Sequence, residues 1–100
     1  MERRLTIARA AVAPEREGDY LAALRALAEA ATRDGRHLWV FRHGREPGRY
    51  VEFRESGGPW PPPSDEERPH LERLRALAAY EPGGDDHWTE IRFDRLDRKD

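Results

Sequence analysis

Hydrophobic residues recur with a helical spacing in two segments of the chain that lie 50 residues apart. The repeated positions are Leu21, Leu24, Leu27 and Ala28 in the first segment and Leu71, Leu74, Leu77 and Ala78 in the second. This spacing is typical of amphipathic helices, which turn once in about 3.6 residues. Strand-like runs flank both segments, so the pattern predicts a strand–helix–strand unit that occurs twice.

Alternation of apolar and polar residues predicts a strand over residues 4–12, and short strand-like runs predict three more over residues 37–42, 50–54 and 87–93. One helix is predicted from a first turn at Pro14 to a stop at Gly35, and a second from about Pro69 to Tyr80, after a short turn over residues 64–68. Right-handed connections then give a four-stranded antiparallel sheet with strand order 4-1-3-2 and both helices on one face. The predicted class is therefore α+β, with the ferredoxin-like order βαββαβ.

A chain of 100 residues is expected to form one domain. We place this domain at residues 1–93 and expect residues 94–100 to be a charged tail. Residues 56–64, between the third strand and the second helix, include four prolines and two glycines. That composition predicts a stiff, extended loop.

A sheet that is covered by helices on one face is expected to be apolar on that face alone. The second strand, however, is apolar on both faces. We assign Trp39, Phe41, Phe53, Ile91 and Phe93 to the helix-covered face, and Leu5, Ile7, Leu38, Val40, Tyr50 and Trp88 to the other. The second apolar surface predicts a homodimer in which two sheets pack face to face. The alternative is a monomer whose mixed face is solvated.

The net charge of −2 gives no electrostatic reason to expect nucleic acid or an anionic membrane as a partner. RNA recognition modules share this order of elements, but they need two aromatic residues on one face of the third strand, where this chain has Tyr50 and Glu52. The sequence has no apolar run that is long enough for a membrane span, and we expect a cytoplasmic protein. The absence of cysteine excludes disulfides and thiolate chemistry.

Three local patterns, together with the order of elements, carry a resemblance to a known family. They are the start Leu5-Thr6-Ile7-Ala8-Arg9-Ala10 leading to Pro14, the run Phe53-Arg54-Glu55 before a loop, and His70 at the start of the second helix. Over roughly residues 4–93 the chain resembles the dimeric α+β barrel superfamily, and within it the antibiotic biosynthesis monooxygenase-like (ABM-like) group. The resemblance implies a pocket between helices and sheet, in which quinol-like aromatic substrates react with molecular oxygen without a metal or flavin cofactor.

His70 is the candidate catalytic residue. It falls within the arc of the second helix that is predicted to be buried, and an imidazole there can act as a general base for an acidic phenol. The candidate substrate-binding residues are Trp39, Phe41, His37, Trp60 and Tyr20. Each has a plainer interpretation, because His70 can be a hydrogen-bonded residue at a helix start and the aromatic residues can fill the core or an interface. The four histidines lack the close spacing of a metal site, and no metal ligands are predicted.

Two functions therefore stay open. The first is a small cofactor-independent monooxygenase-like protein that acts on or binds an aromatic, quinol-like molecule between helices and sheet. The second is a non-catalytic dimeric α+β barrel with a ligand-binding or structural role.

Overall fold

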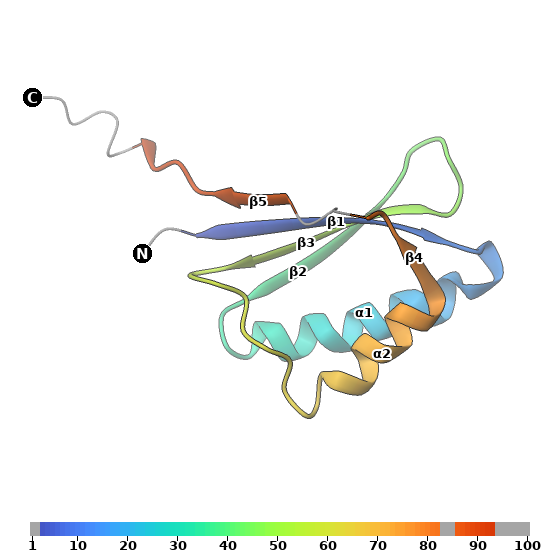
Figure 1. The fold of residues 1–100 in the computed structure, drawn as a ribbon, viewed down its shortest axis with the longest axis horizontal. Helices are drawn as coiled ribbons and strands as arrows, with labels where there is room; N and C mark the ends of the chain where they lie inside the picture. Colours follow the sequence, from blue (N-terminus) through green and yellow to red (C-terminus); the bar gives the residue numbers. More distant parts are fainter. Residues whose placement is uncertain (1–2, 83–85, 94–100) are drawn as a thin grey trace, which may run out of the picture.

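The computed structural model describes residues 3–82 and 86–93, and its helices and strands follow the predicted order closely. The strands are β1 (Arg4–Val12), β2 (His37–Arg42), β3 (Arg49–Ser56), β4 (Ala78–Tyr80) and β5 (Asp86–Thr89), and the helices are α1 (Glu17–Thr32), preceded by one 3-10 turn over Pro14–Arg16, and α2 (Arg68–Leu77). Figure 1 shows a single sheet with both helices against one of its faces. The predicted α+β ferredoxin-like fold is confirmed. The predicted charged tail, residues 94–100, lies outside the described residues.

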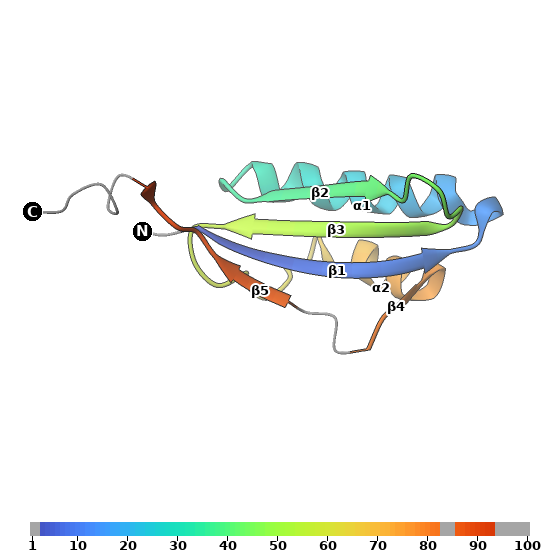
Figure 2. The ribbon, with the colours of Figure 1, turned by 90° about the horizontal axis from the view of Figure 1, so that it is seen from above.

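All pairings in the sheet are antiparallel, and the strands are ordered β2-β3-β1-β4. β4 and β5 share one edge of β1: β5 pairs with its first half and β4 with its last residues (Figure 2). Two short segments thus occupy the edge of the sheet at which the sequence predicts one fourth strand. The sequence placed residues 78–80 in the second helix and residues 90–93 in the last strand, and both placements are wrong.

The early end of α2 has a local cause. Ala78 has an extended backbone, with φ −122° and ψ 144°, so the chain leaves the helix and joins the edge of β1. In this conformation Tyr80 pairs with Ala10 of β1, and its hydroxyl reaches a buried carboxylate of β3, the next strand beyond β1. The hydrogen bonds of residues 78–80 to β1 and of Tyr80 to Glu52 therefore compensate for the missing last turn of the helix.

The core lies between the helices and the sheet, and it corrects the predicted assignment of the sheet's two faces. Leu38 and Tyr50 are buried beneath the helices, and Val40 packs against the same core, whereas the exposed fractions of Trp39 and Phe41 are 46% and 56%. Phe53 packs edge-on against Phe41 on the uncovered face. Ile91 and Phe93, predicted to face the helices, are largely exposed and lie beyond β5.

β2 and β3 turn the opposite side chains to the helices from those predicted, because the inward polar residues of β3 have partners, whereas Ile7 of β1 lies on the uncovered face as predicted. Strong alternation marks Tyr50, Glu52 and Arg54 as one side of that strand, and charged residues are ordinarily expected to face water. Here Glu52 accepts hydrogen bonds from two tyrosine hydroxyls inside the core, so this side of β3 can be buried. The opposite positions of β1 are small, at Ala8 and Ala10, and leave room for the helices.

A hairpin joins β2 to β3, as the glycines and the proline of residues 44–48 predict. Gly48 has φ +79°, in the region that favours glycine, and its carbonyl accepts a hydrogen bond of 2.8 Å from the Val12 amide. A β-carbon at Gly48 would lie 2.6 Å from the Val12 carbonyl oxygen. The close approach fixes the end of β1 against the hairpin.

Candidate functional site

A cavity of about 300 Å³ lies between α2, the loop before it and the helix-covered face of the sheet. Its floor is apolar and is formed by Ala8, Leu27, Leu38, Leu71 and Leu74. Its wall and rim carry Trp60, Pro61, Pro63, Arg54, Glu67, Arg75, Tyr80 and Glu81. An apolar hollow with a few converging polar groups is the usual form of a small-molecule site.

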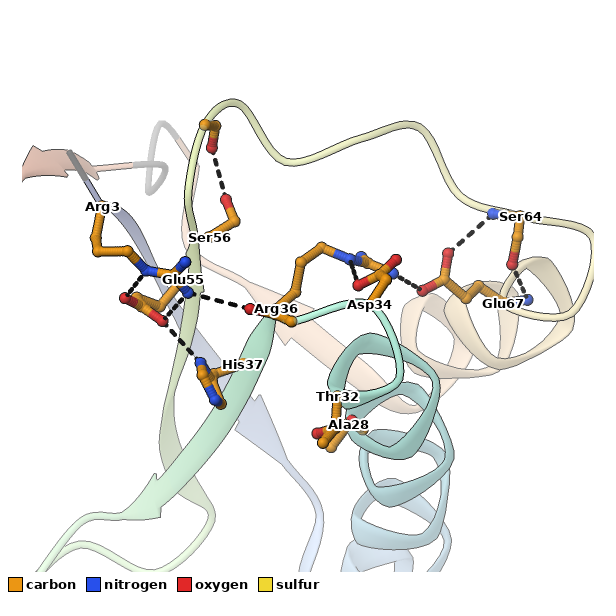
Figure 3. Close-up of polar contacts among 12 residues, drawn as sticks. Arg3, Ala28, Thr32, Asp34, Arg36, His37, Glu55, Ser56, Ser64 and Glu67 are labelled. Atoms are coloured by element: carbon orange, nitrogen blue, oxygen red, sulfur yellow. Dashed lines mark hydrogen bonds and ion pairs between the residues drawn. The ribbon is translucent and has the colours of Figure 1, made fainter. Parts of the chain in front are cut away.

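Trp60 packs in the cavity wall against an arginine from the loop between α1 and β2. The Arg36 guanidinium lies 4.5 Å from the centre of the Trp60 ring, a cation–π arrangement. Arg36 is itself buried and donates to Asp34 at 2.7 Å and to Glu67 at 3.0 Å (Figure 3). Both partners raise the pKa of Arg36, and the hydrogen bond to Asp34 has the largest effect. The Trp60 ring therefore packs on a buried cation whose Nε and Nη2 atoms are hydrogen-bonded, whereas its Nη1 atom is buried without a partner among the described residues.

Glu67 connects this anchor to the start of α2. The Glu67 amide donates to the Ser64 hydroxyl at 3.2 Å, and the Ser64 amide donates to the Glu67 carboxylate at 2.9 Å (Figure 3), which is a reciprocal capping box. Burial favours the neutral acid, but the hydrogen bonds from Ser64 and Arg36 outweigh it and lower the pKa of Glu67. Pro69 lies in the first turn of α2, where its missing amide hydrogen costs nothing.

A fully buried carboxylate lies behind the cavity wall. Glu52 is 0% exposed, and its Oε2 atom accepts hydrogen bonds of 2.7 Å from the hydroxyls of Tyr20 and Tyr80. Its Oε1 atom has no hydrogen-bond partner among the described residues, and Arg54 Nη2 lies 3.4 Å from it. Burying a carboxylate is costly unless donors replace water, so the two tyrosines stabilise Glu52 in the core.

The two tyrosines differ in what they reach. Burial, and then the neighbouring Glu52, raise the pKa of both hydroxyls well above the ordinary value, so both are neutral donors at ordinary pH. Arg54 and Arg75 act on the pKa of Tyr80 in the opposite direction. Tyr80 lines the cavity, whereas Tyr20 is buried in the core and is absent from the cavity wall.

The structure brings only one of the six predicted site residues to the cavity wall, namely Trp60. Tyr20 fills the core and contacts the site through Glu52. His37, Trp39 and Phe41 were expected to line a pocket beneath the helices, but they lie on the uncovered face. There His37 stacks on Trp39 with 5.3 Å between ring centres, and its Nδ1 lies 2.8 Å from Glu55 (Figure 3).

His70 is half-buried in the first turn of α2 and does not line the cavity. The lining residues of this helix, Leu71, Leu74 and Arg75, follow an arc that leaves His70 on its flank. The assignment of His70 as a base stays a prediction, to which the geometry adds no contact with the cavity.

Sequence reasoning missed the polar groups Arg54 and Tyr80 of the cavity wall and the carboxylate of Glu52 behind them. The signal was present in β3, where Tyr50, Glu52 and Arg54 share one face and can satisfy one another. Tyr80 carried no such signal, because the helical spacing of the preceding leucines extends to it. Its role follows from the strand β4, which the sequence did not predict.

Within the described ranges, 3–82 and 86–93, no group of three or more histidine, aspartate or glutamate side chains could hold a metal ion. Over the same part of the chain, no helix is long and apolar enough to cross a membrane.

The described strands and helices define an α+β protein with a ferredoxin-like fold and a cavity between its helices and its sheet. Among solved structures the chain is similar to SnoaB, a cofactor-independent oxygenase from Streptomyces nogalater, with a TM-score of 0.61 and 18% identity over 92% of this chain and 94% of that one. A mutant of SnoaB matches over the same shares of the two chains, with a TM-score of 0.60 and 20% identity. The predicted resemblance is thereby confirmed for the fold. No family model matches the sequence, and no curated protein matches it.

Proposed function

We propose that the protein is a small cofactor-independent monooxygenase-like enzyme that takes a phenolic, quinol-like aromatic molecule into the cavity between α2 and the sheet. The observation that carries this proposal is the cavity itself, in which an apolar floor and the Trp60 ring adjoin the polar groups Arg54 and Tyr80. The structural similarity to a cofactor-independent oxygenase supports the choice of chemistry.

The cavity suits a planar ligand with one polar edge. Leucines of three different elements form the floor, and Trp60, framed by prolines, offers a ring against which an aromatic ligand can stack. At about 300 Å³ the cavity is at the small end of ligand sites, so it favours one or two fused rings over a larger polycycle. The polar groups gather on one wall, where a ligand hydroxyl would find donors and acceptors.

The test is oxidation of a dihydroxynaphthalene under isotopically labelled oxygen gas. Monooxygenation replaces one ring C–H by a carbonyl, so a hydroxynaphthoquinone forms with one labelled oxygen atom and the second oxygen leaves as water. We expect labelled product with the wild-type protein and a loss of at least about tenfold in rate for Trp60→Leu. Trp39→Leu is the matched control, because Trp39 lies on the uncovered face, and it should retain the rate. Binding without labelled product would favour the non-catalytic ligand-binding function, and no binding would refute both.

We also propose that two copies form a homodimer through the uncovered face of the sheet. Trp39, Phe41 and Trp88 are each about half exposed or more, and Phe53 and Ile7 adjoin them. A hollow of about 340 Å³ lies on this face, lined in part by Ile7, Phe41, Val51 and Phe53. Monomeric proteins rarely expose an apolar surface of this kind.

Sedimentation equilibrium tests the homodimer. We expect a doubled mass at micromolar concentration for the wild type and a single mass for Phe41→Glu, which would bury a charge in the interface. Ala22→Glu adds the same charge on the exposed side of α1 and should stay dimeric. A wild-type protein with the mass of one chain would refute the homodimer and leave the cavity proposal intact.

A further inference from the structure

One hydrogen bond connects Tyr80, a residue of the cavity wall, to a buried carboxylate. We propose that Tyr80 and Glu52 form a proton relay, in which Tyr80 receives the proton of a phenolic ligand hydroxyl and passes its own proton to Glu52. The inference rests on the proposed function, since it needs a phenolic ligand in the cavity. It assigns the base of the site to the sheet rather than to a histidine.

The geometry places the two ends of the relay where they are needed. Tyr80 lines the cavity, and its hydroxyl donates to Glu52 Oε2 at 2.7 Å. Glu52 is closed off from solvent, so a ligand reaches it through Tyr80 and not directly. Its Oε1 has no hydrogen-bond partner among residues 3–82 and 86–93, which leaves the carboxylate with unused capacity to accept.

The proton transfer balances within the site. The O–H bond of the ligand breaks, its proton goes to the Tyr80 hydroxyl oxygen, and its electron pair stays on the ligand oxygen as a phenolate. The original proton of Tyr80 goes to Glu52 Oε2. Tyr80 is neutral before and after the transfer, so the high pKa of its hydroxyl does not oppose the overall step.

The surrounding charges favour the phenolate. The transfer moves one negative charge from the buried Glu52 to the ligand, on the cavity wall that carries Arg54 and Arg75. Arg54 is already within 3.4 Å of Glu52, so it lies near the charge in both states. Arg75 makes no hydrogen bond or ion pair within the described part of the chain. Cations on the wall of a site stabilise an oxyanion that develops beside them.

Tyr20 provides a natural control. It donates to the same oxygen of Glu52 over the same 2.7 Å, but from α1 and without access to the cavity. Around Glu52 and its two donors, Arg54 on β3 faces the carboxylate and Arg75 on α2 acts on Tyr80. The ring centre of Tyr50 lies 5.0 Å from that of Tyr20. A structural role for the hydrogen bonds predicts similar effects for the two tyrosines, whereas a relay predicts a difference.

The experiment uses hydroxycoumarin, whose neutral and anionic forms absorb at different wavelengths. The probe is bound to the purified full chain at a pH at which the free probe is neutral. We expect the wild type and Tyr20→Phe to give the anionic band, and Tyr80→Phe and Glu52→Gln to reduce it at least about fivefold while the probe stays bound. Thermal unfolding of each variant verifies that it is folded at the assay temperature.

The outcomes separate the relay from the proposed function. A bound probe that stays neutral in the wild type overturns the relay and leaves the phenol-binding cavity standing. Equal loss of the anionic band in Tyr20→Phe and Tyr80→Phe also overturns the relay, because it indicates that the tyrosines act only by supporting Glu52. Failure of the wild type to bind the probe overturns the relay together with the proposed ligand class.

Discussion

Removing one hydroxyl from the core should reveal how strongly the buried carboxylate depends on its donors. In Tyr20→Phe the ring remains and only the 2.7 Å hydrogen bond to Glu52 is lost. A buried hydrogen bond to a charged group contributes about 1.5–3 kcal/mol. Because Tyr80 still donates to the same oxygen, we expect a loss of about 2 kcal/mol in the free energy of unfolding, and about a 10 °C fall in Tm for a domain of this size.

The double variant Tyr20→Phe/Tyr80→Phe makes the prediction sharper. It leaves Oε2 of Glu52 without either donor, so the loss should exceed the sum of the two single losses by about 1 kcal/mol. Urea unfolding followed by circular dichroism measures each free energy. Tyr50→Phe is the control, since that hydroxyl donates to the partly exposed Glu17 and should cost less than about 1 kcal/mol.

A fall in Tm of less than about 2 °C for Tyr20→Phe would refute this reasoning. It would mean that Glu52 does not need both donors in the core. A double variant whose loss equals the sum of the single losses would refute the shared dependence on one oxygen atom.

Further predictions concern the hairpin, an ion-pair cluster and His70. Gly48→Ala should lower the free energy of unfolding in urea by at least about 1 kcal/mol, because φ is +79° and the new β-carbon meets the Val12 carbonyl; an unchanged midpoint would contradict this. Hydrogen bonds from Arg3, which has the larger effect, and from His37 lower the pKa of Glu55 from 4.5 to about 2. The contribution of ionised Glu55 to stability is therefore present above pH 4.5 and lost as the pH falls through about 2. On acid titration, the free energy of unfolding of Glu55→Gln should fall less than that of the wild type. An equal fall in the two proteins would contradict the lowered pKa of Glu55. His70→Ala should keep the labelled-oxygen product, since His70 does not line the cavity, whereas abolished turnover in a stable variant would restore it as the base.

The order of the elements could be predicted from the sequence because each signal was local. The helical spacing of the leucines, the alternation in β1, the apolar run in β2 and the turn residues over 44–48 each indicate an element without knowledge of the rest of the chain. Strand order then followed from the right-handed connection rule. These predictions needed no information about which residues meet in space.

The orientation of the sheet could not be predicted in this way. β2 is apolar on both faces, so its own pattern does not distinguish the helix-covered side, and the choice depended on β3. There Glu52 and Arg54 favoured an outward orientation, although Tyr20 and Tyr80 satisfy Glu52 from two distant segments. The error followed from pairing Glu52 with arginines on the uncovered face, before its two tyrosine partners inside the core were known.

The candidate site was only partly predictable for the same reason. Trp60 was recognised because an aromatic residue in a proline-rich loop stands out in the sequence, and it does line the cavity. Tyr80 was assigned to the end of a helix, and its contact with Glu52 exists only because the chain turns into β4. Such a contact depends on a change of secondary structure that the periodicity does not reveal.

The most direct test of the central claim is a crystal structure of the protein with a dihydroxynaphthalene, grown without oxygen. The account predicts one ligand in the cavity, stacked against Trp60, with a hydroxyl within hydrogen-bond distance of Tyr80. A ligand seated on the uncovered face against Trp39 and Phe41, or a cavity that stays closed to it, would contradict the account.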